Sequence, residues 1–466
     1  MNLDITPELK AYLDAEGKVV LNACPGGGKT TAISQKIINL EEEYKSTYGS
    51  HSGIACISFT NAAKDELNLT YNQLCGRTLQ YPHLVSTIDS FINTFITLPF
   101  YYRLERNFAR PQILESNERL DLFWKTKYKN KNGKLVDGLK NPMNSFKAKT
   151  NRSIYYQYQP SQIRLEPDGS YTVNGNAPSE EKVDLDVFEK YCKYIKGWQF
   201  EKGLITTNDS AFIALRLLKK NPSIGKWLSK RFPHIIVDEA QDNSLMQHQI
   251  FEELNNQGLA NIEFIGDPYQ SLYEFRDANP QLFLDKYKNE DYLSLDLSNN
   301  RRSPQRIIDC FSLLRPEAER TIKSACKTDL KEPLLVYRYK ADDRGDIINH
   351  FEQYCSDKNY KKLKVVVRGN SVRNKMLGRD AQQRPWHNSM AYELIAAKIE
   401  YDDKNLKDAI NIARNIVIRL ENQDLSFAEF GHLRAELKTD FLFNAHIIKF
   451  VEGLPELSHT VEDWSN

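Results

Sequence analysis

The sequence lacks the features that mark secreted, membrane-spanning and metal-stapled proteins. Its 466 residues include seven cysteines, and no two of them form a Cys-x-x-Cys pair. An odd, scattered set of cysteines favours neither a disulfide framework nor a thiolate zinc site. The N-terminus has no apolar signal-peptide core, and no run approaches the ~18 apolar residues that cross a bilayer. These absences predict a cytoplasmic protein with reduced cysteines and no membrane contact.

An excess of charge of one sign is also missing. Lys and Arg number 63, Asp and Glu number 62, and the net charge is +1. This balance excludes a uniformly basic nucleic-acid coat and an acidic tail, although a local patch can be hidden within it. Residues 121–152 are such a patch: net +7, interleaved with Trp124, Tyr128 and Phe146. A phosphate-binding surface and a solvated loop are both consistent with this composition.

A strand, a glycine-rich loop and a helix follow one another near the N-terminus. The apolar run 18–23 predicts a buried strand, and residues 32–38 have helical spacing. The loop between them fits the Walker A pattern, with Ala in place of the first Gly. Its glycines let backbone N–H groups approach phosphate oxygens, Lys29 can reach the β- and γ-phosphates, and Thr30 can bind Mg²⁺. We therefore predict ATP binding by Ala23, Cys24, Pro25, Gly26, Gly27, Gly28, Lys29, Thr30 and Thr31.

An acidic cluster supplies the second half of such a site. The predicted strand 234–237 runs into Asp238-Glu239-Ala240-Gln241-Asp242. Asp238 is placed to hold Mg²⁺ together with Thr30, and Glu239 is placed to accept a proton from the attacking water. Acidic residues after a strand can also merely cap a helix. The presence of both motifs favours the catalytic interpretation.

Strands and helices alternate along the chain, which predicts an α/β fold with a parallel sheet covered on both faces. Further strands are expected at 54–59, 262–265, 334–337 and 363–367, and helices at 61–69, 210–220, 391–399 and 409–420.

The motifs resemble those of superfamily 1 helicases of the UvrD/Rep type. Residues 238–242 resemble motif II of that family. The other similar segments occur in the expected order: 58–67 resembles motif Ia, 86–91 motif Ib, 266–278 motif III and 297–304 motif IV. Five ordered motifs are far more specific than any one of them.

The resemblance implies a fold and a domain plan. The fold would be a RecA-like P-loop NTPase motor domain with a parallel sheet, a helical inserted subdomain, and a partial second RecA-like domain with a helical insert. The expected boundaries are 1–98 with 203–300 for the first motor domain, 99–202 for the inserted subdomain, 301–375 for the start of the second motor domain, and 376–466 for its helical insert.

The resemblance also implies roles for single residues. Gln270 would contact the γ-phosphate or the water, and Arg302 would place a positive charge on the γ-phosphate; with Glu239 they form the expected catalytic set. The expected DNA-binding residues are Phe59, Thr60, Asn61, Ser86, Thr87, Tyr273 and Phe275. The last two would offer faces on which bases stack, with core packing as the alternative.

Two positions depart from the family pattern at the nucleotide base. Leu9 follows Pro7-Glu8 where the family places a Gln that reads adenine, and Arg301 stands where a Tyr stacks on adenine. An Arg plane can also stack. ATP and Mg²⁺ remain the expected cofactors, but we predict that nucleotide choice is relaxed.

Motifs V and VI of the family are not found after Arg302. Either the sequence is part of a longer protein, or a partner completes the site. Motif VI would supply a second arginine finger, and such fingers are worth roughly 10³–10⁵ in rate in related phosphoryl-transfer enzymes. We therefore expect weak unwinding by residues 1–466 alone.

The expected function is a DNA-dependent ATPase and helicase subunit that translocates on single-stranded DNA or on duplex with ends. The chain also resembles the helicase-like (GajB) subunits of the Gabija anti-phage defence system, which implies a GajA-like nuclease partner. The alternative is a regulatory partner of a nuclease that senses nucleotide or DNA ends and unwinds little.

Overall fold

The computed structural model separates into two compact units, residues 1–333 and 334–466, which are described individually. It describes residues 5–104, 110–114, 118–129, 133–271, 278–315, 321–328, 335–338, 344–361, 363–367, 372, 389–402, 406–422, 430, 433–434, 436–438 and 440–456.

A six-stranded parallel sheet forms the centre of the first unit, in the order β12-β1-β11-β10-β2-β3. Its strands are β1 (Lys18–Ala23), β2 (Ile54–Ser58), β3 (Leu84–Thr87), β10 (His234–Val237), β11 (Asn261–Gly266) and β12 (Leu293–Leu297). The strands predicted at 18–23, 54–59, 234–237 and 262–265 are confirmed to within a residue. The pattern missed β3 and β12, which are less completely buried than β2 and β10.

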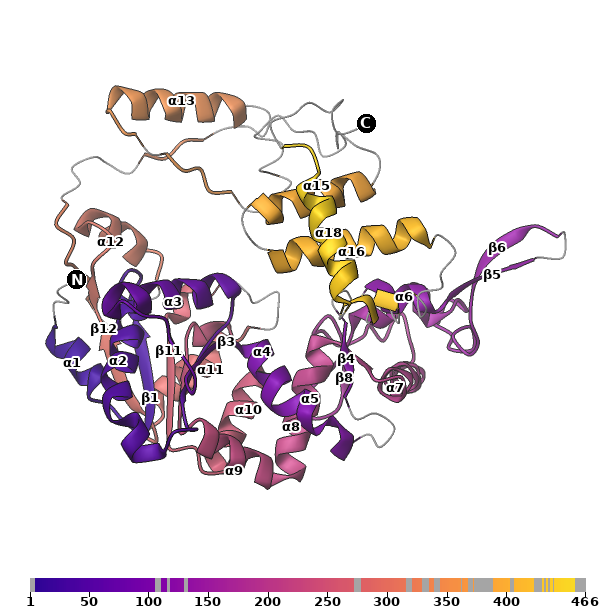
Figure 1. The fold of residues 1–466 in the computed structure, drawn as a ribbon, viewed down its shortest axis with the longest axis horizontal. Coiled ribbons are helices and arrows are strands. Elements are labelled where there is room, and N and C mark those ends of the chain that lie inside the picture. The colour runs from indigo at the N-terminus through magenta and orange to yellow at the C-terminus, as the bar shows by residue number, and fades with distance from the viewer. Residues whose placement is uncertain are drawn as a thin grey trace. The chain divides into compact units, whose positions relative to one another are not determined.

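Helices cover both faces of this sheet (Figure 1). Alternate residues of β10 point to opposite faces, so Ile235 and Val237 join one buried cluster and Ile236 joins the other. The helices packed on the first face are α4 (Ile88–Ile92), α8 (Thr207–Lys220), α9 (Pro222–Arg231) and α10 (Leu245–Asn256). Those on the second face are α1 (Pro7–Leu13), α2 (Lys29–Tyr48) and α3 (Asn61–Cys75).

Side-chain caps begin several of these helices just after the strands. Thr60 caps α3 by accepting the Ala63 N–H at 3.1 Å, and Gly76 at φ 74° ends the same helix. Because caps satisfy backbone groups that the helix itself leaves unpaired, the strand-to-helix turns stay short and fixed. The six parallel strands and the helices on both faces of their sheet confirm the predicted α/β architecture.

The inserted region between α5 (Leu98–Phe100) and α8 is mixed rather than helical. It contains α6 (Glu118–Phe123), α7 (Leu185–Glu201), and two antiparallel hairpins. The hairpins pair β5 (Lys125–Lys129) with β6 (Leu135–Leu139), and β7 (Ile163–Leu165) with β8 (Tyr171–Val173). The helices of the expected helical insert are thus accompanied by hairpins, because alternating residues followed by Asn-Gly are typical of a hairpin.

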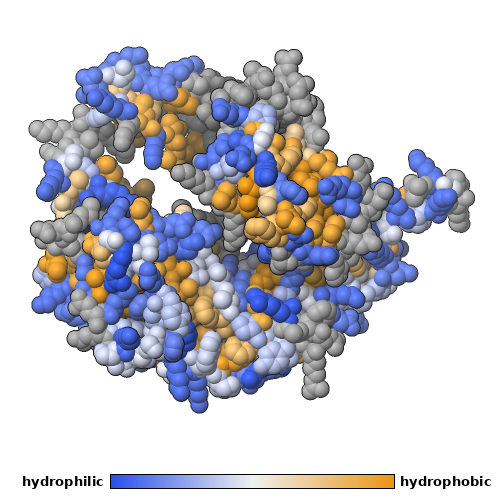
Figure 2. Space-filling view, in the orientation of Figure 1, coloured by the Kyte–Doolittle hydropathy of each residue, from blue (hydrophilic) through white to orange (hydrophobic). Residues whose placement is uncertain are grey.

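In the second unit, α15 (Ser389–Asp402), α16 (Leu406–Glu421) and α18 (Phe441–Glu452) pack around Ala397, Ala413 and Ile447. They confirm the helices predicted at 391–399 and 409–420. Figure 2 shows apolar residues on the surface of these helices, where Phe441 and Leu442 are 82% and 70% exposed.

The strands predicted at 334–337 and 363–367 are wrong for the described residues 335–338 and 363–367, which form no strand. Val366 in the second segment is 91% exposed. An apolar run becomes a strand only when a neighbour pairs with its backbone, and the sequence pattern does not report that neighbour. Helix α13 (Arg344–Asp357) lies between the two segments in the chain.

Candidate nucleotide site

The carboxyl ends of the parallel strands bring the predicted motifs to one edge of the sheet. The phosphate loop follows β1, Asp238 follows β10, and Asp267 follows β11, which pairs with both of those strands. Ligands of open α/β sheets bind in the crevice at this edge, where the strand order reverses. Here β1 is the first strand in the sequence, yet in the sheet it lies between β11 and β12.

The phosphate loop needs its glycines for space and for backbone conformation. Gly28, with φ 87°, caps α2, and Gly26 has φ 67°, so both adopt the left-handed region. A Cβ on Gly26 would also lie 2.6 Å from Cβ of Arg302. Ala23, which replaces the first glycine of the pattern, is a fully buried residue of β1.

Lys29 reaches the acidic cluster. Its Nζ lies 3.3 Å from Oε2 of Glu239, and the two side chains are 12% and 32% exposed. Glu239 has φ 52°, a conformation that is uncommon for a residue with a side chain and is concentrated at functional sites. Its backbone N–H donates to Oδ1 of Asp238 at 3.0 Å. The structure thus brings together three of the residues predicted for the site.

Asp238 is almost fully buried at the end of β10. Burial raises the pKa of this carboxyl to about 7, with a further upward contribution from Glu239 and an opposing one from Lys29. A buried carboxylate with this pKa is stabilised by an added positive charge, so the position suits a cation ligand. Thr30, the other predicted ligand, lies in the first turn of α2 and is half-buried.

A chain of hydrogen bonds joins Glu239 to the residues after β11. The Nε2 of Gln241 donates to Oε2 of Glu239 at 2.8 Å, and its Oε1 accepts the Asp267 N–H at 3.1 Å. The Oδ2 of Asp267 then accepts from Nε2 of Gln270 at 2.7 Å. Gln270, predicted to be catalytic, is therefore linked to Glu239 through two intermediate residues, Gln241 and Asp267.

The segment after β12 wraps around the phosphate loop. Asn300 has no exposed surface; its Nδ2 donates to the Pro25 carbonyl at 2.5 Å, and its Oδ1 accepts the Arg302 N–H at 2.9 Å. The Arg301 N–H donates to the Gly26 carbonyl at 2.9 Å. Arg302 is thereby held beside the loop, although its own side chain is exposed.

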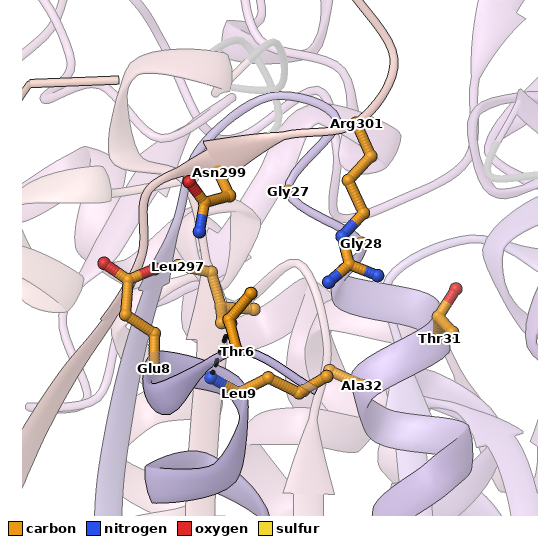
Figure 3. A pocket seen from close by; sticks show the side chains of 10 residues that line it. All are labelled: Thr6, Glu8, Leu9, Gly27, Gly28, Thr31, Ala32, Leu297, Asn299 and Arg301. Atoms are coloured by element: carbon orange, nitrogen blue, oxygen red, sulfur yellow. Dashed lines mark hydrogen bonds between the residues drawn. The ribbon is translucent and has the colours of Figure 1, made fainter. Parts of the chain in front are cut away.

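A pocket opens beside the phosphate loop (Figure 3). Leu9 of α1 lines it and Arg301 reaches across it toward Gly28. The carboxylate of Glu8 accepts the Ser298 N–H at 2.9 Å and also the Ser298 hydroxyl. Because Leu9 offers only apolar contact and Glu8 is already bonded, the wall formed by α1 presents few groups that could read a base.

The residues predicted to contact DNA lie at the ends of two neighbouring strands. Ser58 of β2 pairs in register with Thr87 of β3, so Phe59, Thr60 and Asn61 lie near Ser86 and Thr87. Asn61 is exposed, whereas Ser86 is buried and Phe59 packs partly against the core. The predicted stacking residues Tyr273 and Phe275 lie outside the described residues.

Sequence reasoning missed several residues that organise the site. Asp267 and Asn300 lie inside recognised motifs, but the pattern does not reveal that both are buried and bonded to other motifs. Gln241 likewise lies within the acidic cluster. Arg315, whose Nη2 lies 2.6 Å from Oδ2 of Asp267, has no sequence signal.

A doubly covered parallel sheet with a glycine-rich phosphate loop and an acidic strand end defines a P-loop nucleotide-binding protein. The family model described as the UvrD/REP helicase N-terminal domain matches residues 6–291. The chain therefore belongs to the UvrD/REP helicase family.

Three relatives illustrate the similarity. ATP-dependent DNA helicase Rep of Buchnera aphidicola is 23% identical over 426 residues, covering 87% of this chain and 60% of that protein. An ATP-dependent helicase/nuclease subunit of Geobacillus kaustophilus is 33% identical over 131 residues, covering 24% and 10%. RecBCD enzyme subunit RecB of Buchnera aphidicola is 34% identical over 123 residues, covering 26% and 10%. This chain thus spans about 60% of the length of Rep and a tenth of the other two.

Proposed function

We propose that this chain is a DNA-dependent ATPase of the helicase class, which hydrolyses nucleoside triphosphate at the phosphate loop and moves along DNA. The observation that carries the proposal is the contact between Lys29 and Glu239 beside the buried Asp238. It joins a phosphate-binding lysine, a base for the attacking water, and a cation ligand at one edge of the sheet.

The donor set fits a magnesium ion. Asp238 and Thr30 would hold it, and an oxygen-only set with one carboxylate is what Mg²⁺ prefers beside phosphates. The ion would neutralise charge on the phosphates when bound. Glu239 would orient and deprotonate the water, Lys29 would bind the phosphates, and Gln270 and Arg302 would stabilise the charge that develops on the γ-phosphate.

The proposed DNA track is the edge formed by the ends of β2 and β3, where Asn61 is exposed and Thr60 and Thr87 are half-buried. The hairpin β5–β6 is a second candidate contact. Lys125, Lys127 and Lys129 are exposed there and, as alternate residues of one strand, share a face. Figure 2 shows the described part of this arm as mostly hydrophilic.

The first test measures ATP hydrolysis with and without single-stranded DNA. We expect DNA to stimulate hydrolysis in the wild-type chain. Lys29→Ala should abolish hydrolysis because the phosphates lose their lysine, and Glu239→Gln should reduce it by about 10²–10⁴-fold while nucleotide still binds. Unchanged hydrolysis in a Lys29→Ala variant that unfolds like wild type would remove the site assignment.

We further propose that the protein works with a nuclease, as the resemblance to Gabija helicase-like subunits implies. Two relatives bear the name of an ATP-dependent helicase/nuclease subunit, which supports this proposal. Co-purification with a nuclease encoded beside this chain would support it. Processive unwinding by the chain without any partner would favour an independent helicase, whereas nuclease activity that requires the chain without unwinding would favour the regulatory alternative.

A further inference from the structure

Arg315 is a charged residue that belongs to none of the recognised motifs. It follows α12 (Gln305–Ser312), and its side chain is 12% exposed. Its Nη2 lies 2.6 Å from Oδ2 of Asp267, whose side chain has no exposed surface. A carboxylate buried to this degree needs a charged partner, because burial removes the water that would otherwise stabilise its charge.

Asp267 connects this arginine to the turn that carries Gln270. The same Oδ2 accepts from Nε2 of Gln270 at 2.7 Å, and Oδ1 accepts the Tyr269 N–H at 3.1 Å. The Arg315 guanidinium also lies 5.0 Å from the centre of the Tyr269 ring. Arg315 therefore contacts both the carboxylate that binds Gln270 and the residue immediately before it.

The contacts continue to the proposed base. Asp267 donates its N–H to Gln241, which donates to Glu239. A Cβ on Gly266 would lie 2.3 Å from Oε1 of Gln241, so this close approach depends on the glycine. The path from Arg315 to Glu239 thus consists of hydrogen bonds between buried or partly buried groups.

We propose that Arg315 is a positioning residue for nucleotide hydrolysis, an inference that rests on the proposed ATPase function. The arginine neutralises Asp267 and so holds the Gln270 amide and, through Gln241, the Glu239 carboxylate in one arrangement. When the guanidinium is lost, the donors that this carboxylate keeps among the described residues are neutral, namely the Gln270 amide and the Tyr269 N–H. The carboxylate is then no longer fixed by a charged partner, so the Gln270 amide bonded to it loses the arrangement in which it stabilises the reacting phosphate.

The test compares Arg315→Met, Arg315→Lys and Arg306→Met, the last at an exposed arginine of α12, the helix that precedes Arg315. For Arg315→Met we expect kcat for ATP hydrolysis to fall about 10–100-fold with KM within threefold of wild type, because the lost interaction acts in the transition state. Arg315→Lys should recover part of kcat because it restores the charge, and Arg306→Met should match wild type. A kcat of Arg315→Met within twofold of wild type, or a loss confined to KM, overturns the proposal.

Two additions keep the test decisive. If Arg315→Met does not unfold cooperatively, the double variant Asp267→Asn, Arg315→Met removes both charges and should fold; wild-type kcat in that variant overturns the proposal. Binding of ADP with aluminium fluoride needs no turnover, and we expect it to weaken at least tenfold in Arg315→Met while ADP alone binds as before. Equal affinity for the fluoride complex refutes the role of Arg315, whereas a wild-type chain that hydrolyses no ATP refutes the proposed function.

Discussion

Leu9 lies near the start of the first unit's sequence and Arg301 near its end, yet both line the same pocket. Where the family has a glutamine and a tyrosine, this pocket offers an apolar side chain and a guanidinium. Leu9 offers no hydrogen bond to a base, and a pocket that forms few such bonds rejects other bases weakly, whereas one built to form them rejects them strongly. We therefore expect these two residues to weaken base discrimination at this site.

We predict that the wild-type chain hydrolyses ATP, GTP, CTP and UTP with kcat/KM values within about tenfold of one another. The double variant Leu9→Gln, Arg301→Tyr should favour ATP by at least a further tenfold, because it adds an amide and a stacking ring. Leu9→Met keeps the apolar contact and serves as the control. Exclusive use of ATP by the wild-type chain would contradict the prediction.

Glu263 of β11 lies in a fully buried cluster of charged and polar residues. Its Oε1 lies 2.7 Å from Nζ of Lys36 and 2.6 Å from Nε2 of His234, and its Oε2 accepts the Tyr12 hydroxyl at 2.8 Å. Burial alone would raise the pKa of Glu263, but His234 and Lys36 outweigh burial and lower it to about 2. The cluster joins α1 and α2 to the two central strands.

This pKa predicts how stability depends on pH. The folded pKa is below the usual 4.5, so the unfolded chain takes up the proton first as the pH falls. The stabilisation, about 3 kcal/mol, is therefore present above pH 4.5 and is lost between pH 4.5 and about 2. Chemical denaturation at several pH values measures it.

Glu263→Gln should remove this acid-dependent term and destabilise the protein at pH 7 by about 3–5 kcal/mol, because Lys36 is left buried without its counter-charge. Glu290→Gln, at an exposed position, should leave both quantities unchanged. If the free energy of unfolding of Glu263→Gln falls below pH 4.5 as steeply as that of wild type, Glu263 does not cause the loss of stability in acid.

Among the secondary-structure elements, the hairpin β5–β6 bears on the two interpretations of the basic patch at 121–152. Trp124 is buried and Phe146 packs partly against the same core, so these aromatic residues hold the insert together. Tyr128 is 54% exposed, and the three lysines of β5 lie on the surface. The buried aromatic residues thus anchor the hairpin to the core of the insert. This anchoring favours phosphate contact by its lysines over a solvated loop.

We predict that replacing Lys125, Lys127 and Lys129 with Gln weakens DNA binding without changing DNA-independent hydrolysis. Each lost phosphate contact should reduce the slope of log Kobs against log salt by about 0.9 on duplex DNA, so three contacts reduce it by about 2–3. Fluorescence anisotropy at several salt concentrations measures this slope.

A matched triple substitution of exposed lysines elsewhere controls for net charge: Lys45, Lys190 and Lys288 to Gln. An equal change of slope in both triple variants would show that the hairpin has no specific part in binding.

The elements differ in how well the sequence predicted them. Strands β2 and β10 are buried runs followed by turn residues, and both were predicted because burial on two faces leaves an apolar run in the sequence. Strand β12 exposes Leu293 and Ser294 and carries Asp296, so its run is broken and was missed. The segment at 363–367 shows the converse, an apolar run without a pairing partner in the described structure.

At the scale of the whole molecule, the two compact units divide the chain after Pro333. The phosphate loop, Asp238, Gln270 and Arg302 all belong to the first unit. None of the described helices combines the length and the apolar character needed to cross a bilayer.

This division predicts a selective effect of nucleotide in calorimetry. A non-hydrolysable nucleotide with Mg²⁺ should stabilise the first unit by about 2.7 kcal/mol at one hundred times its Kd and leave the second unit's transition unchanged. Lys29→Ala should remove the shift. A nucleotide-dependent shift of the second unit's transition alone would contradict this assignment.

The sequence by itself determined the phosphate loop, the acidic strand end, the order of the motifs and the class of sheet. These are local patterns, in which a few adjacent residues must have particular sizes, charges and backbone freedom. Only the tertiary structure decided that Asp267 is buried and pairs with Arg315, and that Leu9 and Arg301 line the same pocket. Such contacts depend on which strands become neighbours, because parallel strands bring together residues that the chain keeps far apart.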